Sequence, residues 1–247
     1  MNHPSALLEN TGFVFPGESA WPPSLLTPPQ ARKLAATPNA CGRPNSDVLR
    51  RRFAVIEGKT AVSWQIDFPE HFTEQEAALY EKPFALLRQR SVDSAWLNPH
   101  ANPTLRRALA RVSRTLAMPA GATIPEWRWI EEDVVPDVTL LAVARDDDFT
   151  HGILQSTLFA AWHHAHRTRL GPVQIVESFP FPWPPATALG SLTIAQEEQR
   201  HAVARAARGG DQERLNAAVL AAYGWPLYLN DAALLEKLTD LNRQRAK

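Results

Sequence analysis

A β-hairpin is the first element that the alternation of apolar and polar positions predicts. Residues 53–57 and 61–67 are rich in β-branched and aromatic side chains, and a three-residue break beginning at Gly58 separates them. Two such runs around a short glycine-containing break are typical of antiparallel strands joined by a turn. Residues 1–50, in contrast, are rich in Pro and Asn, which favours irregular loops with one short helix at 29–36.

Helical patterns follow the hairpin. Thr73 and Glu76 have the spacing of a capping box, which predicts a helix from there to about Arg90. Pro103 opens another helix, in which apolar residues fall on one side and arginines on the other. The apolar positions are Leu105, Leu109, Val112 and Leu116, and the arginines are Arg107, Arg111 and Arg114. We call these three arginines the arginine stripe, and we expect it to lie on one exposed helix face.

The rest of the chain alternates between strand and helix patterns before becoming helical. Strands are expected at 127–130 and 138–144, and a helix at 152–166. After Pro185 the composition changes to Ala, Glu, Gln, Arg and Leu, which favour helices. The helices expected there cover 193–208, 212–222 and 231–245.

This order of elements predicts a mixed α/β fold of the α+β type. We expect a twisted mixed β-sheet with packed helices in a first domain at 1–187, followed by a small helical region at 188–247. A chain of 247 residues is long enough for a main domain with a smaller appendage.

Composition excludes several classes of protein. No stretch approaches the roughly 18 consecutive apolar residues of a membrane helix, and no signal-like segment begins the sequence. The sequence therefore predicts a cytoplasmic protein without a membrane partner. Cys41 is the only cysteine, so neither an internal disulfide nor a cysteine-rich zinc site is possible.

Charge is balanced overall but not locally. The formal net charge is zero, which argues against a protein that is basic over its whole surface. Between residues 82 and 115, however, seven Lys or Arg residues face a single acid, Asp93. The cations of this stretch are Lys82, Arg88, Arg90, Arg106, Arg107, Arg111 and Arg114. Such a local excess can support a nucleic-acid contact even when the total charge is zero.

The motifs of the common catalytic sites are absent from the sequence. It has no glycine-rich phosphate loop and no Gly-x-Ser-x-Gly nucleophile turn. A methyltransferase of the usual class needs a glycine-rich cofactor turn, and one that acts on adenine also needs an Asn/Asp-Pro-Pro-Tyr/Phe loop. Neither occurs, because the Pro-Pro pairs at 22–23, 28–29 and 184–185 are not preceded by Asn or Asp. No catalytic residue and no cofactor site are expected in this chain.

Two clusters of polar residues have competing interpretations. Asp146, Asp147 and Asp148 could hold Mg²⁺ as in a nuclease, but such runs commonly cap helices and turn the chain, and we favour that structural role. His163 and His166 share a helix face, yet no cysteine or well-spaced carboxylate completes a metal site. With His164 they more plausibly form a polar helix end that touches solvent or nucleic acid.

Two further features bear on nucleic acid. The arginine stripe could follow a phosphate backbone, or it could be an ordinary solvated helix face. Trp127 and Trp129 flank Arg128 and could offer a stacking or base-reading surface, although core packing is expected for at least one of them.

An ordered set of short blocks resembles one family of proteins. These blocks are 42–50 (Gly-Arg-Pro-Asn-Ser-Asp-Val-Leu-Arg), 64–68 (Trp-Gln-Ile-Asp-Phe), 76–80, 144–149 with Gly152 and Trp162, 177–182, 221–226 (Ala-Ala-Tyr-Gly-Trp-Pro) and 238–242. Together they resemble the target-recognition and C-terminal regions of the adenine methyltransferases of type IIL restriction-modification systems and related phage-defence enzymes.

The resemblance implies a function without catalysis in this chain. In that family the blocks follow the catalytic domain, so a partner chain or another part of the gene would bind S-adenosylmethionine and transfer the methyl group to adenine N6 after base flipping. The implied partners are double-stranded DNA and this methyltransferase catalytic subunit.

The resemblance also assigns roles to particular residues. The segment 119–137 would read bases, through Glu126 and Arg128, because Arg can bind guanine with two hydrogen bonds and Glu can accept one from cytosine. Relatives usually have a basic, polar run after Pro119, whereas this chain has the small and apolar run 120–125. The implied contacts to the DNA backbone come from Arg106, Arg107, Arg111, Arg114, Arg145 and Ser156.

Two other functions remain as alternatives. The zero net charge and the apolar run 120–125 would suit a protein-interaction or scaffold subunit of a defence complex without DNA readout of its own. A metal-dependent nuclease using the three consecutive aspartates ranks last.

Overall fold

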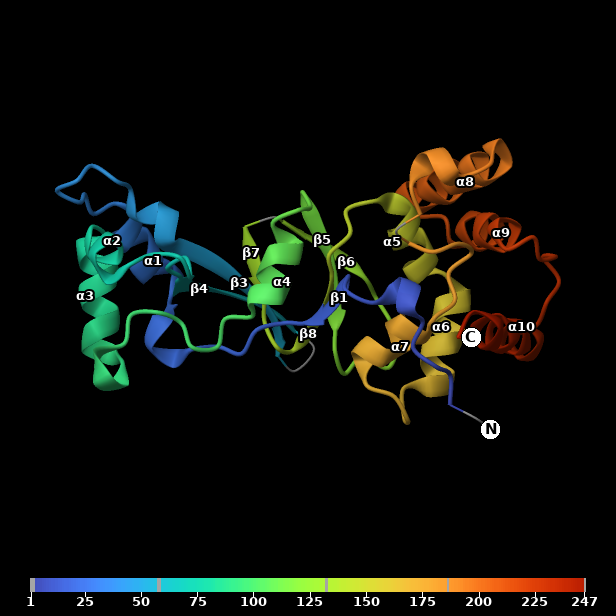
Figure 1. The fold of residues 1–247 in the computed structure, drawn as a ribbon, viewed down its shortest axis with the longest axis horizontal. Coiled ribbons are helices and arrows are strands. Elements are labelled where there is room, and N and C mark those ends of the chain that lie inside the picture. The colour runs from blue at the N-terminus through green and yellow to red at the C-terminus, as the bar shows by residue number, and fades with distance from the viewer. Residues whose placement is uncertain (1–2, 57–58, 132, 186, 247) are drawn as a thin grey trace. The chain divides into compact units, whose positions relative to one another are not determined.

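The computed structural model describes residues 3–56, 59–131, 133–185 and 187–246. Contacts divide the chain into two compact units (Figure 1). The first unit comprises Met1–Pro16, Arg107–Ile130 and Leu141–Lys247, and the second comprises Gly17–Arg106 and Glu131–Leu140. These units do not coincide with the expected ranges 1–187 and 188–247, and the functional labels given to those ranges stay predictions.

The first unit is organised around a sheet of four strands in the order β1-β8-β5-β6. The strands are β1 (Val14–Pro16), β5 (Arg114–Pro119), β6 (Arg128–Glu131) and β8 (Leu140–Val143). Strands β1 and β8 run antiparallel, with Val14 opposite Val143. Strand β5 has its central residues fully buried, as expected for a strand in the middle of a sheet. Strand β6 lies at the edge of the sheet, where one side of its backbone has no neighbouring strand.

Six α-helices complete the described part of this unit. They are α5 (Asp148–Gln155), α6 (Thr157–His166), α7 (Pro172–Ser178), α8 (Ile194–Gly209), α9 (Gln212–Ala222) and α10 (Asp231–Arg245). Figure 1 shows α8, α9 and α10, in orange to red, beside α5 and α6. Apolar residues of the sheet and of these helices belong to one core.

A glycine on α5 allows this helix to approach both α8 and α9 closely. A Cβ atom at Gly152, on α5, would lie 2.7 Å from Val203 Cγ1 and 3.2 Å from Leu215 Cδ1. Because real Cβ atoms do not approach carbon that closely, only glycine fits between α5 and the helices α8 and α9. The C-terminal helices are thus part of the first unit's core.

Buried asparagines tie distant segments of the first unit together. Asn242, on α10, is 1% exposed, and its Nδ2 donates to the carbonyls of Ser5 (2.8 Å) and Ser178 (2.7 Å). Asn10 Nδ2 donates to the carbonyls of Glu177 (3.0 Å) and Phe179 (2.7 Å). The bonds to residues 177–179 satisfy carbonyl groups that α7 leaves free at its end, and the bonds of Asn242 tie α10 to Ser5 and to Ser178.

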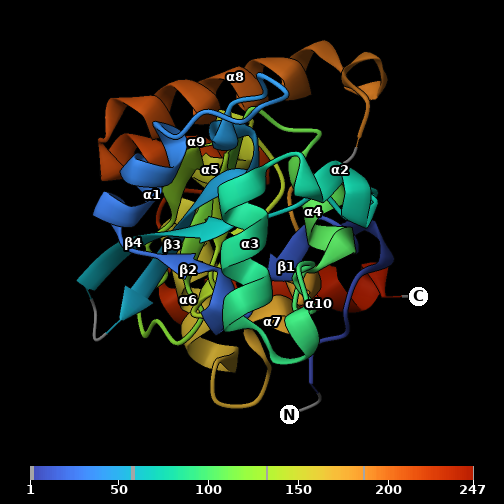
Figure 2. The same ribbon diagram turned by 90° about the vertical axis from the view of Figure 1, so that its left-hand side faces the viewer.

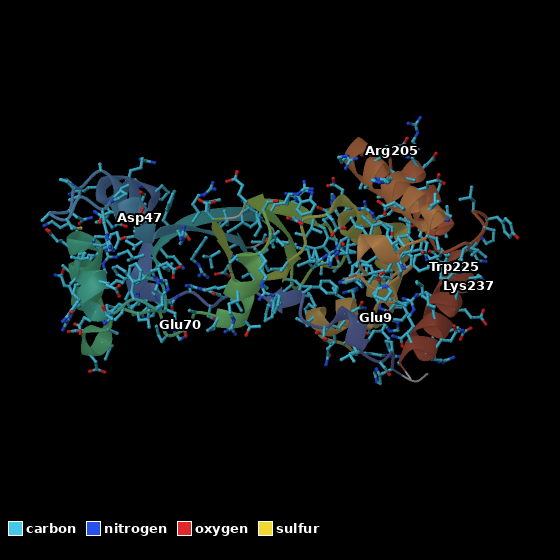
Figure 3. The ribbon with its side chains drawn as sticks, turned by 45° about the horizontal axis from the view of Figure 1, so that its top comes forward. Glu9, Asp47, Glu70, Arg205, Trp225 and Lys237 are labelled. Carbon is cyan, nitrogen blue, oxygen red and sulfur yellow. The ribbon has the colours of Figure 1, made fainter. Side chains whose placement is uncertain are left out.

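The turn between α9 and α10 carries exposed apolar side chains. Tyr223 stacks on Trp225 with ring centroids 4.5 Å apart, and Lys237 Nζ lies 5.6 Å from the Trp225 centroid (Figure 3). Leu227 and Tyr228 follow and are 67% and 87% exposed.

The second unit contains another four-stranded sheet, in the order β2-β4-β3-β7. The strands are β2 (Leu25–Leu26), β3 (Leu49–Ile56), β4 (Lys59–Ile66) and β7 (Val134–Pro136). Strands β3 and β4 are antiparallel, from Leu49 opposite Ile66 to Ile56 opposite Lys59, and β7 runs parallel to β3. The expected hairpin strands are confirmed, while residues 57 and 58 of the expected turn lie outside the described residues.

Helices cover this second sheet. They are α1 (Pro28–Ala35), α2 (Glu74–Ala78) and α3 (Glu81–Arg90), and α4 (Pro103–Leu109) stands where the chain leaves the unit. Figure 2 shows α3 in front of β2, β3 and β4. Leu87 of α3 shares a core with Leu49 and Ile66 of the hairpin.

A buried arginine joins three segments of the second unit. Arg52, on β3, is 1% exposed. Its Nη1 donates to Gln65 Oε1 at 2.9 Å, and its Nη2 donates to the Glu18 carbonyl at 2.7 Å and to Asp137 Oδ2 at 2.5 Å. These acceptors compensate for the loss of hydration of the guanidinium.

The α+β class is confirmed, with the strands distributed over two sheets rather than one. The three C-terminal helices, the short helix α1 and the strands β6 and β8 lie close to their expected ranges. Two expected helices are each divided, at Leu79–Tyr80 and at Ser156, and α7 was not expected. No helix in the described ranges combines the length and hydrophobicity needed to span a membrane.

The expected helix that carried the arginine stripe is wrong beyond Leu109. Helix α4 ends there, and Arg114 instead begins strand β5. The apolar spacing that suggested a helix is overridden by the sheet, because Thr115 and Leu116 are buried between neighbouring strands. The arginine stripe therefore does not exist as a single helix face.

Candidate nucleic-acid interface

An exposed pair of opposite charges lies at the edge of the first unit's sheet. Arg128 begins strand β6, and its Nη2 is 3.3 Å from Oε2 of Glu126. Both side chains are well exposed, at 67% for Arg128 and 63% for Glu126. An exposed ion pair of this kind contributes little to stability. Each of the two side chains can therefore leave the other and bind an external partner with little loss of free energy.

Trp127 anchors this segment in the core. It is 3% exposed, and its ring lies 6.0 Å from that of Phe159 on α6. Its backbone N–H donates to Gln155 Oε1 at 3.1 Å. The expected core packing of at least one of the two tryptophans is thus realised by Trp127, while the residues on either side of it point to solvent.

Two arginines of the former stripe remain exposed. Arg107 lies on α4, and Arg111 lies in the turn between α4 and β5. Within the part of the chain that the structure describes, neither forms an ion pair. Both therefore present free cationic groups, as a contact to phosphate requires.

Arg106 serves a different purpose from the one expected. Its Nε and Nη2 donate to the carboxylate of buried Glu18 at 2.7 and 2.8 Å, and its Nη2 also lies 2.9 Å from Asp67 Oδ1. Burial alone would lower the pKa of Arg106, but the two carboxylates raise it, so the guanidinium remains charged. Arg106 is an internal counter-ion of the second unit. Its guanidinium is engaged by these carboxylates and is not free for the expected contact with the DNA backbone.

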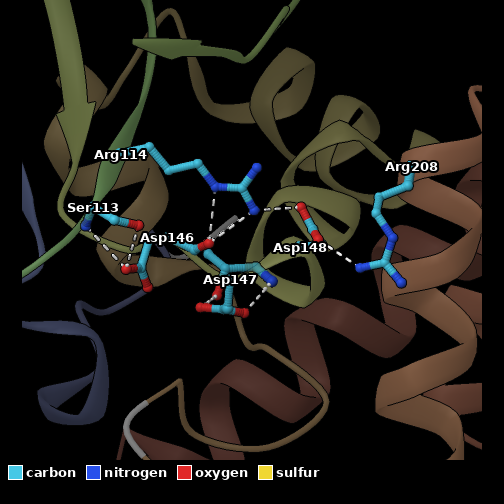
Figure 4. Close-up of polar contacts among 7 residues, drawn as sticks. Ser113, Arg114, Asp146, Asp147, Asp148 and Arg208 are labelled. Atoms are coloured by element: carbon cyan, nitrogen blue, oxygen red, sulfur yellow. Dashed lines mark hydrogen bonds and ion pairs between the residues drawn. The ribbon is translucent and has the colours of Figure 1, made fainter. Parts of the chain in front are cut away.

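Arg114 is also engaged within the protein (Figure 4). Its Nε and Nη2 donate to the Asp146 carbonyl at 3.1 and 3.0 Å, and its Nη2 donates to Asp148 Oδ1 at 2.7 Å. The guanidinium carbon lies 3.8 Å from the ring centroid of Trp129, an arrangement favourable for a cation–π interaction. Arg114 therefore has a structural role, instead of the contact with the DNA backbone that was expected from the sequence.

The three aspartates have the structural role that we favoured. Asp147 caps α5, because its side chain accepts from Thr150 N at 2.8 Å. Asp146 accepts from the N–H and hydroxyl of Ser113, both at 3.1 Å. Asp148 pairs with Arg114 and, at 2.6 Å, with Arg208 on α8. Each of the three carboxylates thus accepts hydrogen bonds from the protein, which agrees with the structural role.

Arg145 and Ser156 complete the expected backbone contacts. Arg145 is partly exposed and pairs with Asp147 at 3.1 Å. Ser156 is 1% exposed; its hydroxyl donates to the Ile153 carbonyl at 2.6 Å and accepts from Phe159 N as the cap of α6. Because its hydroxyl is buried and fully used, Ser156 does not reach an external phosphate, and that assignment is corrected.

The histidines of α6 differ in their surroundings. His163 is 2% exposed, whereas His164 faces solvent. His166 lies against Trp162, with ring centroids 4.4 Å apart. Burial lowers the pKa of His163 and of His166, so both favour the neutral form. No group of three metal-ligating side chains occurs within the described ranges.

Several partners of these arginines could not be found from the sequence. Arg208 lies 60 residues after Asp148 along the chain, and Glu18 lies 88 residues before Arg106. No local pattern connects such positions. Glu18 itself stands between Gly17 and Ser19, so its neighbours in the sequence give no sign of a buried counter-ion.

A test of the Asp148 pair follows from its ionisation. Burial alone would raise the pKa of Asp148, but hydrogen bonds from Arg208 and Arg114 lower it below its usual value. A carboxylate with a lowered pKa stabilises the fold above its unfolded pKa of about 3.9, and this contribution is lost as the pH falls through the folded pKa. We expect Asp148→Asn to cost about 1.5–3 kcal/mol at pH 7.

Thermal unfolding from pH 7 to pH 3 measures this effect. The difference in melting temperature between Asp148→Asn and the parent protein should shrink below about pH 4. Asp240→Asn is the matched control, because Asp240 forms an exposed pair with Arg243 on one helix and should matter little at any pH. A difference that stays constant down to pH 3 would contradict the pairing.

Comparisons with known proteins place the fold but not a family. No family model matches the chain, and no curated protein matches it. Its fold is similar to a solved structure described as the type IIL restriction-modification enzyme MmeI in complex with DNA, with a TM-score of 0.57 and 14% identity. The likeness covers 100% of this chain and 36% of that chain. The chain therefore has a fold that occurs in a restriction-modification enzyme, and it spans just over a third of that enzyme's length.

Proposed function

We propose that this chain is the sequence-specific DNA recognition module of an adenine-specific DNA methyltransferase, in a restriction-modification or phage-defence system. The observation that carries the proposal is the likeness of fold along the whole chain to part of a restriction-modification enzyme that was solved with DNA. The short sequence blocks that resemble those of type IIL enzymes support the same function.

The exposed pair on β6 supplies the base-reading chemistry. Arg128 can donate two hydrogen bonds to guanine O6 and N7, and Glu126 can accept one from cytosine N4. Since their side chains are 3.3 Å apart in the free protein, the two residues can address the same G·C pair. Their attachment to buried Trp127 keeps the backbone of this segment in place, which favours a specific geometry.

Phosphate contacts are assigned to fewer arginines than the sequence suggested. Arg107 and Arg111 are exposed and serve best, with partly exposed Arg145 as a further donor. Contacts of this type position the duplex without reading its sequence.

Catalysis is assigned to a separate domain. The sequence lacks a glycine-rich cofactor turn and an adenine-binding Asn/Asp-Pro-Pro-Tyr/Phe loop. A methyltransferase catalytic subunit that binds S-adenosylmethionine would therefore complete the enzyme, and the flipped adenine would be held there.

The main prediction contrasts exposed arginines assigned to phosphate with one assigned to a base. Arg107→Ala should weaken binding to all duplexes and reduce the slope of log K against log salt by about 1, because one phosphate contact is lost. Arg111→Ala should behave in the same way. Arg128→Ala should instead weaken binding to the preferred sequence by about 10- to 100-fold, because a base contact is lost. Its binding to random duplex should be almost unaffected. Fluorescence anisotropy with both duplexes at several salt concentrations measures these effects.

The control is Arg214→Ala, since Arg214 is 83% exposed on α9 and, within the described residues, pairs with Asp211, which caps the start of that helix. This variant should match the parent protein on every duplex. An equal loss on all sequences for Arg128→Ala would disprove the base-reading role.

A protein-interaction subunit without DNA readout is the second candidate. It is favoured by the exposed apolar residues Leu227 and Tyr228 and by the internal use of Arg106 and Arg114. The two candidates differ at low salt, where a recognition module binds random duplex and a pure interaction subunit does not.

A further inference from the structure

Burial alternates strictly along the segment that leads into β6. Ile124, Glu126 and Arg128 are exposed, whereas Pro125 and Trp127 between them are buried. Ile124 has 69% of its surface exposed, compared with 3% for Trp127. In an extended chain successive side chains point to opposite sides, so the three exposed side chains lie on one side of this segment. We call Ile124, Glu126 and Arg128 the outward row.

The backbone of the outward row is stiff. Pro125 has a fixed φ, and it restricts the backbone of Ile124 before it to extended conformations. Trp127 is held in the core by its ring and by the hydrogen bond to Gln155. The run 120–123 before the row consists of small residues, and the side chain of Ile124 is exposed.

A lone exposed isoleucine is common on protein surfaces and by itself indicates nothing. Ile124 differs because it shares a side with an exposed pair of hydrogen-bonding groups. It also belongs to the run 120–125, in which the sequence offers no cation for a phosphate contact. The side chain of Ile124 can therefore contact a duplex only through apolar atoms. The one apolar group that distinguishes bases in the major groove is the C5-methyl group of thymine.

We propose that Ile124 is a third specificity-determining residue, which contacts the methyl group of a thymine next to the base pair that Glu126 and Arg128 address. This inference rests on the proposed function. Alternate residues of an extended chain are about 6.6 Å apart, and stacked bases are about 3.4 Å apart along one strand. The thymine therefore lies within about two base steps of the pair that Glu126 addresses.

The test begins with the sequence preference of the full chain. Duplexes bound by the parent protein are selected from a random pool, and each thymine of the selected sequence is then replaced by deoxyuridine, which lacks only the methyl group. Replacement of one thymine should weaken binding about three- to fivefold, as expected for one buried methyl group. The same duplexes are then measured with Ile124→Ala.

Ile124→Ala should lose the same factor on the thymine duplex and should no longer distinguish thymine from deoxyuridine. Ile124→Val should keep part of the distinction. Arg128→Ala is the matched control, because it should bind more weakly yet still distinguish the two duplexes. Unchanged melting temperatures of all three variants would show that the fold is intact, as expected for exposed positions.

The outcomes separate this inference from the proposed function. If the parent protein selects no sequence, the recognition function fails and the role of Ile124 fails with it. If it selects a sequence but no deoxyuridine replacement weakens binding, or if Ile124→Ala still distinguishes thymine from deoxyuridine, only the role of Ile124 is overturned.

Discussion

Arg52→Ala is expected to lower the free energy of unfolding by about 3–5 kcal/mol. The side chain of Arg52 is almost completely buried and is the partner of Asp137, of Gln65 and of the Glu18 carbonyl. Its removal would leave the largely buried carboxylate of Asp137 without a counter-ion and Gln65 Oε1 without its donor, whereas the Glu18 carbonyl keeps a hydrogen bond from Val138 N. Most of the lost stability comes from burying these partners without a hydrogen bond or counter-ion, and less comes from the lost attraction between Arg52 and Asp137.

Chemical denaturation followed by circular dichroism measures this loss. The neighbouring residue provides the control, because Arg51 pairs with Glu131 and Asp133 but its side chain is 31% exposed. Arg51→Ala should cost no more than about 1 kcal/mol, as water replaces the lost partners. If Arg52→Ala and Arg51→Ala lost similar amounts of unfolding free energy, burial of the arginine would not determine the size of the loss.

Trp127→Ala is the second substitution with a large expected effect. It should lower the free energy of unfolding by about 3–5 kcal/mol, because it removes a buried ring from the contact with Phe159 and leaves a cavity. Since Trp127 also fixes the backbone between Glu126 and Arg128, the preference for the selected DNA sequence should fall with it.

Two measurements separate these effects. Thermal unfolding gives the loss of stability, with Glu126→Ala as control, since an exposed neighbour should change it by less than about 0.5 kcal/mol. Binding is compared well below the lower melting temperature, where Trp127→Phe should retain more of the sequence preference than Trp127→Ala. If Trp127→Ala kept full preference, the buried ring would not position the pair.

Local signals in the sequence were sufficient for much of the fold. The cap at Thr73 lies where the sequence predicts it, because a side chain that bonds the first free N–H groups of a helix is a local feature. The three C-terminal helices were predictable for the same reason. In contrast, the region around Arg114 has helical spacing but becomes a strand, since pairing with the rest of a sheet is decided by distant residues.

The site was predictable only in part. The exposure of Glu126 and Arg128 agrees with the alternation in the sequence, although nothing yet tests their contact with DNA. Arg106 and Ser156 were assigned outward roles, and the structure uses both internally. The partner of Arg106, Glu18, could not be identified without the fold, whereas the bonds of Ser156 are those of a local helix cap that the sequence reading missed. Ile124 was overlooked, although its spacing of two from Glu126 was visible.

The alternation from Ile124 to Arg128 assigns core packing and surface display to different residues, although these two requirements usually conflict. Positions 125 and 127 carry the packing, and positions 124, 126 and 128 carry none of it. A change at any of the latter three alters what the surface displays without disturbing the interior that holds it. This edge can therefore diverge rapidly between related proteins while the scaffold beneath it stays the same.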